Sequence, residues 1–322
     1  MRSANFDYII KRIGFAFITI FLVLTFNFVL FRTLPGSAVT DLSRVPNASP
    51  ALRHALAVQF GLAEPKWQQY GAYLSQLFRG NLGVSYVNDQ PVVSNLTTDL
   101  LNTLPMVGLG TIVAILLGIW SGVISAWRWR RPADYVLTDT AIAFYSFPTQ
   151  WLGLMLVLVL GKYLPTTGMT NPFAVGGSTI SHFEDEMLHM ILPSLTVALT
   201  LYGQYTLVVR SAVLETLGED YVLTARAKGL PVRTILRRHV LRNALLPIVT
   251  LMALSLGYVA GGALLVETVF TWPGVGLAVY QAVLQRDYPM LQGAFLVFTL
   301  SVVILNLFAD LLCMKLDPRV VE

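Results

Sequence analysis

Charged residues are scarce in this sequence of 322 residues. Only 12% of them are Asp, Glu, Lys or Arg, whereas 55% are hydrophobic. That balance is too apolar for an ordinary soluble domain of this length. The net charge of +4 requires no nucleic-acid partner, because the basic residues lie in loops between apolar runs, as membrane insertion favours. The composition therefore predicts an all-α polytopic membrane protein surrounded by lipid.

Cysteine and catalytic motifs are also nearly absent. The single cysteine, Cys313, excludes an intramolecular disulfide and provides no metal-binding cluster. The sequence contains no Gly-rich phosphate loop that ends in Gly-Lys-Ser/Thr, no HExxH motif and no Ser-centred nucleophile elbow. His182 and His189 flank an acidic triplet at 184–186, but the spacing fits a solvated helix start better than a zinc site. We therefore expect a non-catalytic chain that binds no metal.

Six uncharged runs are each long enough to span a hydrocarbon layer of about 30 Å. They cover roughly residues 13–31, 101–126, 140–161, 188–209, 244–266 and 288–309. A cleaved signal peptide is the alternative for the first run, but that run exceeds the usual apolar length and no clear small-x-small cleavage site follows it. The sequence therefore predicts six transmembrane helices.

The basic residues predict the orientation of these helices. Six spans place both termini on one side, and that side, with loops 127–134 and 210–243, holds 15 of the 22 Lys and Arg residues. Such a bias marks the cytoplasmic side. The expected organisation is a cytoplasmic N-terminus at 1–12, a first helix at 13–31, an external segment at 32–100 and a five-helix core at 101–322.

Residues 219–247 form the one long cationic segment. Glu219 and Asp220 are suited to begin a helix, and Gly229 to end it in a left-handed conformation. Pro231 then opens a second, amphipathic helix. A short helix with small residues before its turn suits docking in a partner's groove, and a basic loop held to anionic lipid is the alternative.

This segment carries a family resemblance. Residues 224–229, 237–239 and 242–244 resemble the cytoplasmic coupling loop of bacterial ABC importer permeases of the dipeptide, oligopeptide and nickel group. The general Glu-Ala-Ala pattern of such permeases has Leu223 in place of its Glu here, a departure typical of the peptide and nickel subgroup. The residues that this EAA-like coupling motif assigns to ATPase contact are Thr224, Ala225, Arg226, Ala227, Lys228 and Gly229.

The external segment 32–100 also resembles that subgroup. Amphipathic patterns predict two short helices in it, around 49–59 and 65–78. The hypothesis is that this segment touches an extracytoplasmic substrate-binding protein and reaches into its cleft, and a folded cap over the helix ends is the alternative. The contact candidates are Asn81, Leu82, Gly83 and Ser85.

Two further runs resemble the pathway and outer gate of the family. Run 146–153 contains Pro148 and makes Ser146, Thr149 and Gln150 pathway candidates, with a simple kink as the alternative. Run 266–276 makes Glu267, Trp272 and Pro273 gate candidates, with interfacial placement of Glu267 as the alternative. Gly118 and Gly122 predict close helix crossings, and Asp310 is a candidate partner for Arg210.

The resemblance implies an ABC type I importer permease fold in the bacterial inner membrane. It implies a second homologous permease, two ABC ATPase subunits that bind ATP and Mg, an external binding protein, and transport by alternating access. This chain would be the first of the two permeases and bind no cofactor itself. A gradient-driven secondary transporter is the alternative, but ionisable residues are scarce at the span centres. Peptides, nickel chelates and opines all remain open as substrates.

Overall fold

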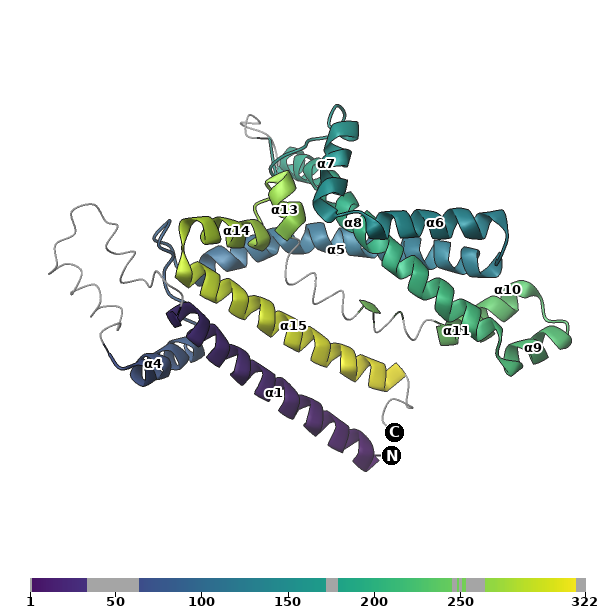
Figure 1. Ribbon diagram of the computed structural model, residues 1–322, viewed down its shortest axis with the longest axis horizontal. Helices are drawn as coiled ribbons and strands as arrows, with labels where there is room; N and C mark the ends of the chain where they lie inside the picture. The colour runs from purple at the N-terminus through teal and green to yellow at the C-terminus, as the bar shows by residue number, and fades with distance from the viewer. Residues whose placement is uncertain are drawn as a thin grey trace.

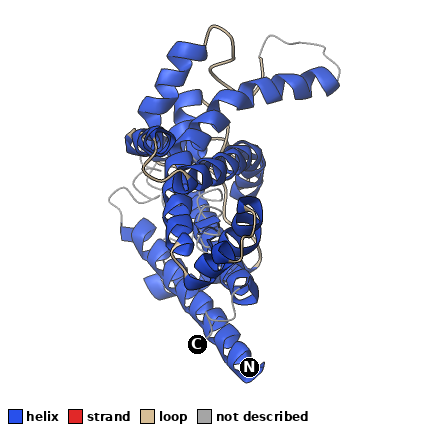
Figure 2. Cartoon of the chain, turned by 90° about the vertical axis from the view of Figure 1, so that its right-hand side faces the viewer, coloured by secondary structure: helices blue, strands red, loops and turns tan. Residues whose placement is uncertain are grey.

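The computed structural model describes residues 2–33, 64–171, 179–244, 248, 251–252 and 264–316. Helices account for nearly all regular structure in these ranges, and no strand occurs in them beyond one isolated bridge between Val84 and Pro91. Figure 2 shows this helical character throughout the described chain. The longer helices are α1 (Arg2–Thr33), α4 (Lys66–Phe78), α5 (Val92–Trp127), α6 (Pro132–Ser146), α7 (Thr149–Leu160), α8 (Thr179–Leu217), α14 (Val275–Gln285) and α15 (Tyr288–Leu316).

Within the described ranges, four helices are long and apolar enough to cross a membrane. They contain the segments Ile9–Phe31, Val92–Trp127, Ile180–Leu217 and Tyr288–Phe308. The pair α6 and α7 gives a fifth candidate if the two are counted as one broken span. The predicted fifth run, 244–266, lies mostly outside the described residues, as does the predicted external helix at 49–59.

The third predicted span is not a single helix. α6 ends at Ser146 and α7 begins at Thr149, with a bend of 107° between them. Pro148 causes the break, because its ring excludes the preceding residue from the helical region and it has no N–H to donate; Phe147 is accordingly extended, at φ −75° and ψ 134°. The predicted span over 140–161 is therefore a bent pair of helices, broken at the proline for which the sequence leaves a kink as the alternative.

Two other predicted boundaries also change. α5 begins at Val92, well before the expected start at Leu101, so the end of the predicted external segment is helical. α8 continues to Leu217, so the predicted loop 210–243 begins inside a helix. The sequence did not predict these extensions because the two helix ends carry polar residues. Water solvates such side chains, and the backbone hydrogen bonds of the helix continue past them.

The core of the protein is the crossing of α5 and α8. A Cβ at Gly118 would lie 2.4 Å from Cβ of Tyr205, and one at Gly122 would lie 2.7 Å from the carbonyl oxygen of Thr206. Beside them the hydroxyls of Ser121 and Thr206 are hydrogen bonded at 2.8 Å. The predicted close crossing is confirmed, since only small side chains permit this approach.

α1 and α15 run side by side in opposite directions, with the start of α1 and the end of α15 at the same end of the structure (Figure 1). The predicted helix over 65–78 is confirmed as α4, which contacts the far end of α1: the hydroxyls of Thr25 and Tyr70 are 2.7 Å apart, and the rings of Phe28 and Tyr70 meet at 5.1 Å. α13 (Leu264–Phe270) and α14 lie toward the start of α5. The short helices that follow α8 lie toward its end.

Candidate functional site

A short helix, α9 (Asp220–Ala227), follows α8 and has the predicted start and end. Glu219 precedes it in an extended conformation, and Gly229 follows it at φ +72°. The amide of Gly229 donates to the carbonyl of Arg226 at 2.9 Å, and that of Leu230 to the carbonyl of Ala225 at 3.3 Å. A Cβ at Gly229 would meet nothing within 4 Å, so the left-handed backbone, not crowding, favours glycine there.

The second helix of the pair begins after Pro231, as predicted, and is a chain of three short helical pieces. They are α10 (Val232–Thr234), a π-helical turn η2 (Ile235–Val240) and α11 (Leu241–Ala244). Ile235 and Val240 are buried, whereas Arg237 and Arg238 are exposed. The predicted amphipathicity is confirmed, but the wide turn was not anticipated, because helical periodicity alone does not distinguish α from π geometry.

α9 has one face that supports it and one that is open. Val222 and Ala225 are buried in the hydrophobic core of the chain, with Ala225 only 4% exposed. Arg226 lies over the ring of Trp127, 5.8 Å from its centroid, and thus links α9 to the end of α5. Ala225 and Arg226, two of the six predicted coupling residues, therefore contact their own chain. All six except Ala225 are exposed, as are Tyr221, Leu223 and Leu230.

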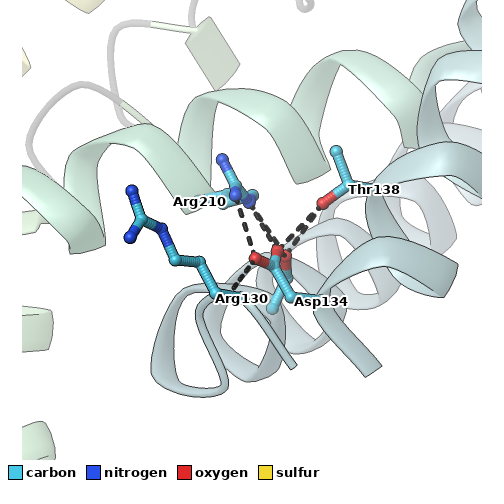
Figure 3. Close-up of polar contacts among 5 residues, drawn as sticks. Arg130, Asp134, Thr138 and Arg210 are labelled. Carbon is cyan, nitrogen blue, oxygen red and sulfur yellow. Dashed lines mark hydrogen bonds and ion pairs between the residues drawn. The ribbon is translucent and has the colours of Figure 1, made fainter. Parts of the chain in front are cut away.

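The carboxylate of Asp134 joins three helices beside this segment (Figure 3). Asp134 is 2% exposed. Its Oδ1 accepts hydrogen bonds from Nε of Arg210 at 2.8 Å, from the hydroxyl of Ser125 at 2.5 Å and from that of Thr138 at 3.2 Å. Its Oδ2 accepts from Nη2 of Arg210 at 3.1 Å and from the amide of Arg130 at 2.9 Å. The buried charge is thus paired and its oxygens are satisfied.

Asp134 is not among the residues predicted from the sequence, where Asp310 is the candidate partner of Arg210. The side chain of Asp310 lies outside the described part of the chain. One local signal was available: Asp134 is the acidic residue in the first turn of α6, directly after a basic loop and before an apolar run. An acid in that position is favoured by the helix dipole, but nothing local identifies Arg210, 76 residues away in sequence, as its partner.

A second buried carboxylate, Glu267 of α13, lies near the other end of α5. Glu267 has 0% exposure. Its Oε1 accepts a hydrogen bond from the hydroxyl of Thr103 at 2.8 Å, and its Oε2 accepts from the amide of Leu277 at 2.9 Å. Within the described residues no cation lies within ion-pair distance of it. Glu267 is thus buried within a hydrogen-bonded network of its own chain, and its role in a gate stays a prediction.

The loop after α13 is fastened to α5 as well. The indole N–H of Trp272, which is fully buried, donates to the carbonyl of Asn102 at 2.9 Å. The side-chain amide of Asn102 donates to the carbonyl of Pro273 at 2.8 Å. A Cβ at Gly274 would lie 2.4 Å from the hydroxyl oxygen of Thr103, so glycine is needed for this approach. The three gate candidates thus belong to one hydrogen-bonded unit.

The four binding-protein candidates do not share one environment. Ser85 is buried, and its hydroxyl donates to the carboxylate of Asp287 at the start of α15. Leu82 packs against the hydrophobic cluster between α5, α14 and α15. Asn81 is exposed, and its Oδ1 accepts from the amide of Gly83 at 2.9 Å. Ser85 and Leu82 therefore hold the segment onto the helices, and Asn81 and Gly83 form its outer turn.

The pathway candidates flank the break between α6 and α7. The hydroxyl of Ser146 donates to the carbonyl of Ile142 in its own helix at 2.8 Å. Gln150 is exposed, and Thr149 is partly buried at the first position of α7. Over the described ranges, no three His, Cys, Asp or Glu side chains gather as a metal site would require. The break thus presents polar side chains without a reactive cluster.

Several helices of membrane-spanning length, with a short helical segment beyond their ends, define the class: a polytopic membrane protein. The family model for the binding-protein-dependent transport system inner membrane component matches residues 114–322, and the model for the N-terminal part of such membrane components matches residues 5–107. The chain belongs to this family. It is a multi-pass, non-catalytic permease of the inner membrane, and the alternative of a gradient-driven secondary transporter is set aside.

Curated relatives match over almost the whole chain. Identity is 32% to the dipeptide transport system permease protein DppB of Escherichia coli, over 98% of both chains. It is 35% to the oligopeptide transport system permease protein AppB of Bacillus subtilis, over 97% of this chain and 98% of that protein. It is 33% to the glutathione transport system permease protein GsiC of Escherichia coli, over 98% of both. The predicted resemblance to peptide permeases is confirmed.

Proposed function

We propose that this chain is the first of two non-identical permease subunits in an ATP-driven importer of short peptides. The names of the relatives above, which cover nearly the whole chain, favour peptides over nickel chelates or opines. In this proposal six transmembrane helices place both termini in the cytoplasm. A second permease completes the pathway, two ATPase subunits supply ATP and Mg, and an external binding protein delivers the peptide.

The observation that carries the proposal is the open face of α9. Leu223 is 49% exposed and Leu230 is 36% exposed, beside the uncrowded turn at Gly229. Exposed apolar side chains are unfavourable in water, and the glycine in the turn leaves room beside them. Together they form a surface suited to a groove in an ATPase. Thr224, Ala227, Lys228 and Gly229 would make the contact, and Ala225 and Arg226 would transmit its motion inward.

Alternating access then requires the far end of the molecule to open when α9 moves. The unit of Glu267, Trp272 and Pro273 is the proposed outer gate, because it fastens the loop after α13 to α5 through a few hydrogen bonds. Ser146, Thr149 and Gln150 at the break after α6 are the proposed pathway residues. Asn81 and Gly83 would touch the binding protein, while Leu82 and Ser85 hold that turn in place.

The test is uptake of a labelled dipeptide by proteoliposomes that contain the complete importer and its binding protein. Gly229→Arg is expected to abolish uptake and the stimulation of ATP hydrolysis by the binding protein, because a long side chain would fill the docking face. Gly229→Asn is the matched control, since Asn tolerates the left-handed backbone and adds much less bulk. Normal uptake by Gly229→Arg, in membranes that hold normal amounts of it, would contradict the proposal.

A further inference from the structure

A cavity of about 810 Å³ lies between the loop after α5 and the helices that follow α8. This volume is in the range of pockets that hold small organic ligands. Its lining includes the apolar residues Leu214, Leu217 and Ile235. It also includes Trp127, Arg131 and Arg226. The cavity thus combines apolar and cationic side chains.

Helices α5 and α8 end at this cavity, at Trp127 and Leu217, and both residues line it. Trp129 lines it too. Tryptophan concentrates where the hydrocarbon layer meets the lipid headgroups. Both tryptophans directly follow the apolar run 101–126, on the side that the basic residues assign to the cytoplasm, and therefore favour a position at headgroup depth.

The cations in the cavity have no carboxylate to neutralise them. Within the described ranges neither Arg131 nor Arg226 makes an ion pair, and no Asp or Glu is among the residues that line the cavity. This differs from Arg210, which is paired with Asp134 at 2.8 Å. Two guanidinium groups in the lining of a partly apolar cavity favour a ligand with an anionic group and an apolar part.

We propose that this cavity binds an anionic phospholipid. The phosphate of the headgroup would lie between Arg131 and Arg226, and the first part of an acyl chain would lie along Leu214 and Leu217. Since Arg226 belongs to α9 and Arg131 to the loop before α6, the lipid would connect the two elements from outside. The inference rests on the proposed orientation, with α9 in the cytoplasm, and concerns a ligand other than the transported solute.

The experiment is native mass spectrometry of the assembled, delipidated importer titrated with phosphatidylglycerol or with phosphatidylcholine of the same chain length. We expect the wild type to bind phosphatidylglycerol about thirtyfold more tightly, because each of the two cations near the headgroup contributes about fivefold. Replacement of both cations, Arg131→Gln with Arg226→Gln, should weaken phosphatidylglycerol binding about thirtyfold and remove the preference. Arg128→Gln is the control for Arg131→Gln alone: each removes one charge from the same loop and both arginines are exposed, but only Arg131 lines the cavity.

Four outcomes would overturn the proposal. Equal affinity of the wild type for the two lipids would show that the cavity does not select an anionic headgroup, and this result does not depend on how any variant folds. A loss in Arg128→Gln equal to that in Arg131→Gln would indicate diffuse surface charge. Displacement by millimolar inorganic phosphate would indicate a free anion, and binding only to the chain without its ATPases would indicate that an ATPase covers the cavity. No arm measures transport, so failure here leaves the peptide-importer proposal untouched.

Discussion

Two buried carboxylates, one near each end of α5, are stabilised in different ways. Asp134 pairs with Arg210 and also accepts hydrogen bonds from Ser125 and Thr138. Glu267 accepts only from neutral groups among the described residues, the hydroxyl of Thr103 and backbone amides. A buried charge with a cationic partner is costly to separate, whereas hydrogen bonds to neutral donors exchange for bonds to water at little net cost. The two ends of α5 are therefore held with different strength.

This difference fits the motions that transport requires. α5, α6 and α8 meet at Asp134 and form a firm base beside α9, so a displacement of α9 would carry these helices together. At the other end, the loop after α13 is bound to α5 by hydrogen bonds from Asn102, Thr103 and Trp272. We infer that the helices at the end with the ion pair move as a unit. At the end with Glu267, the loop after α13 separates from α5.

The largest effect is expected for Asp134→Ala. Removal of the carboxylate leaves Arg210 without its partner in a side-chain environment that is only 25% exposed, so stability should fall by about 3 kcal/mol. Thermal unfolding of the purified chain in detergent measures this loss as a lower Tm. Asp139→Ala is the control, because Asp139 is in the same helix but exposed, and its Tm should stay close to that of the wild type.

A second variant separates the lost ion pair from lost packing. Arg210→Met added to Asp134→Ala removes the unpaired cation, so the double variant should be more stable than Asp134→Ala alone. If the double variant is instead less stable by the sum of the two single losses, the pair is not what holds the three helices together.

The next largest effect is expected at the other end, for Gly274→Ala. The new Cβ would lie 2.4 Å from the hydroxyl oxygen of Thr103 and 2.6 Å from the carboxylate of Glu267, so the loop must shift, at a cost of about 2 kcal/mol. The control is Gly108→Ala in α5, where a Cβ meets nothing within 4 Å and helix propensity predicts a gain of up to about 1 kcal/mol. Equal Tm values for these two variants would contradict the close approach.

Local features of the fold were predictable from sequence, and contacts between distant segments were not. The start of α9 at Asp220 and its end before Gly229 follow from an acidic first turn and a glycine that accepts φ +72°. Pro148 was recognised as a break, but its angle of 107° depends on packing that periodicity does not report. For the same reason the resemblance placed Ala225 at a docking surface, whereas the fold buries it in its own chain.

The candidate site shows the same limit. Burial of Glu267 within the protein is one of the two placements that the sequence predicts, because an ionisable side chain at the end of an apolar run avoids lipid. Its partner Thr103 was not predicted, since the two residues are 164 positions apart and a threonine within an apolar helix has no distinguishing pattern. Ser85 illustrates the opposite case: the family resemblance makes it a candidate for an external contact, but Asp287, 202 positions later, holds it inside.

The smallest effect, and the sharpest test of the difference between the two carboxylates, comes from a matched pair of amide substitutions. In Glu267→Gln the amide oxygen still accepts from Thr103, but the new NH2 group faces the N–H of Leu277, so one hydrogen bond is lost at a cost of about 1 kcal/mol. Asp134→Asn should cost more, because it also removes the charge opposite Arg210. The measurement is the difference in Tm between the two variants in the same detergent. If Glu267→Gln lowers Tm as much as Asp134→Asn, a cationic partner is not what distinguishes the two ends of α5, and the inferred division into a firm base and a parting gate would be wrong.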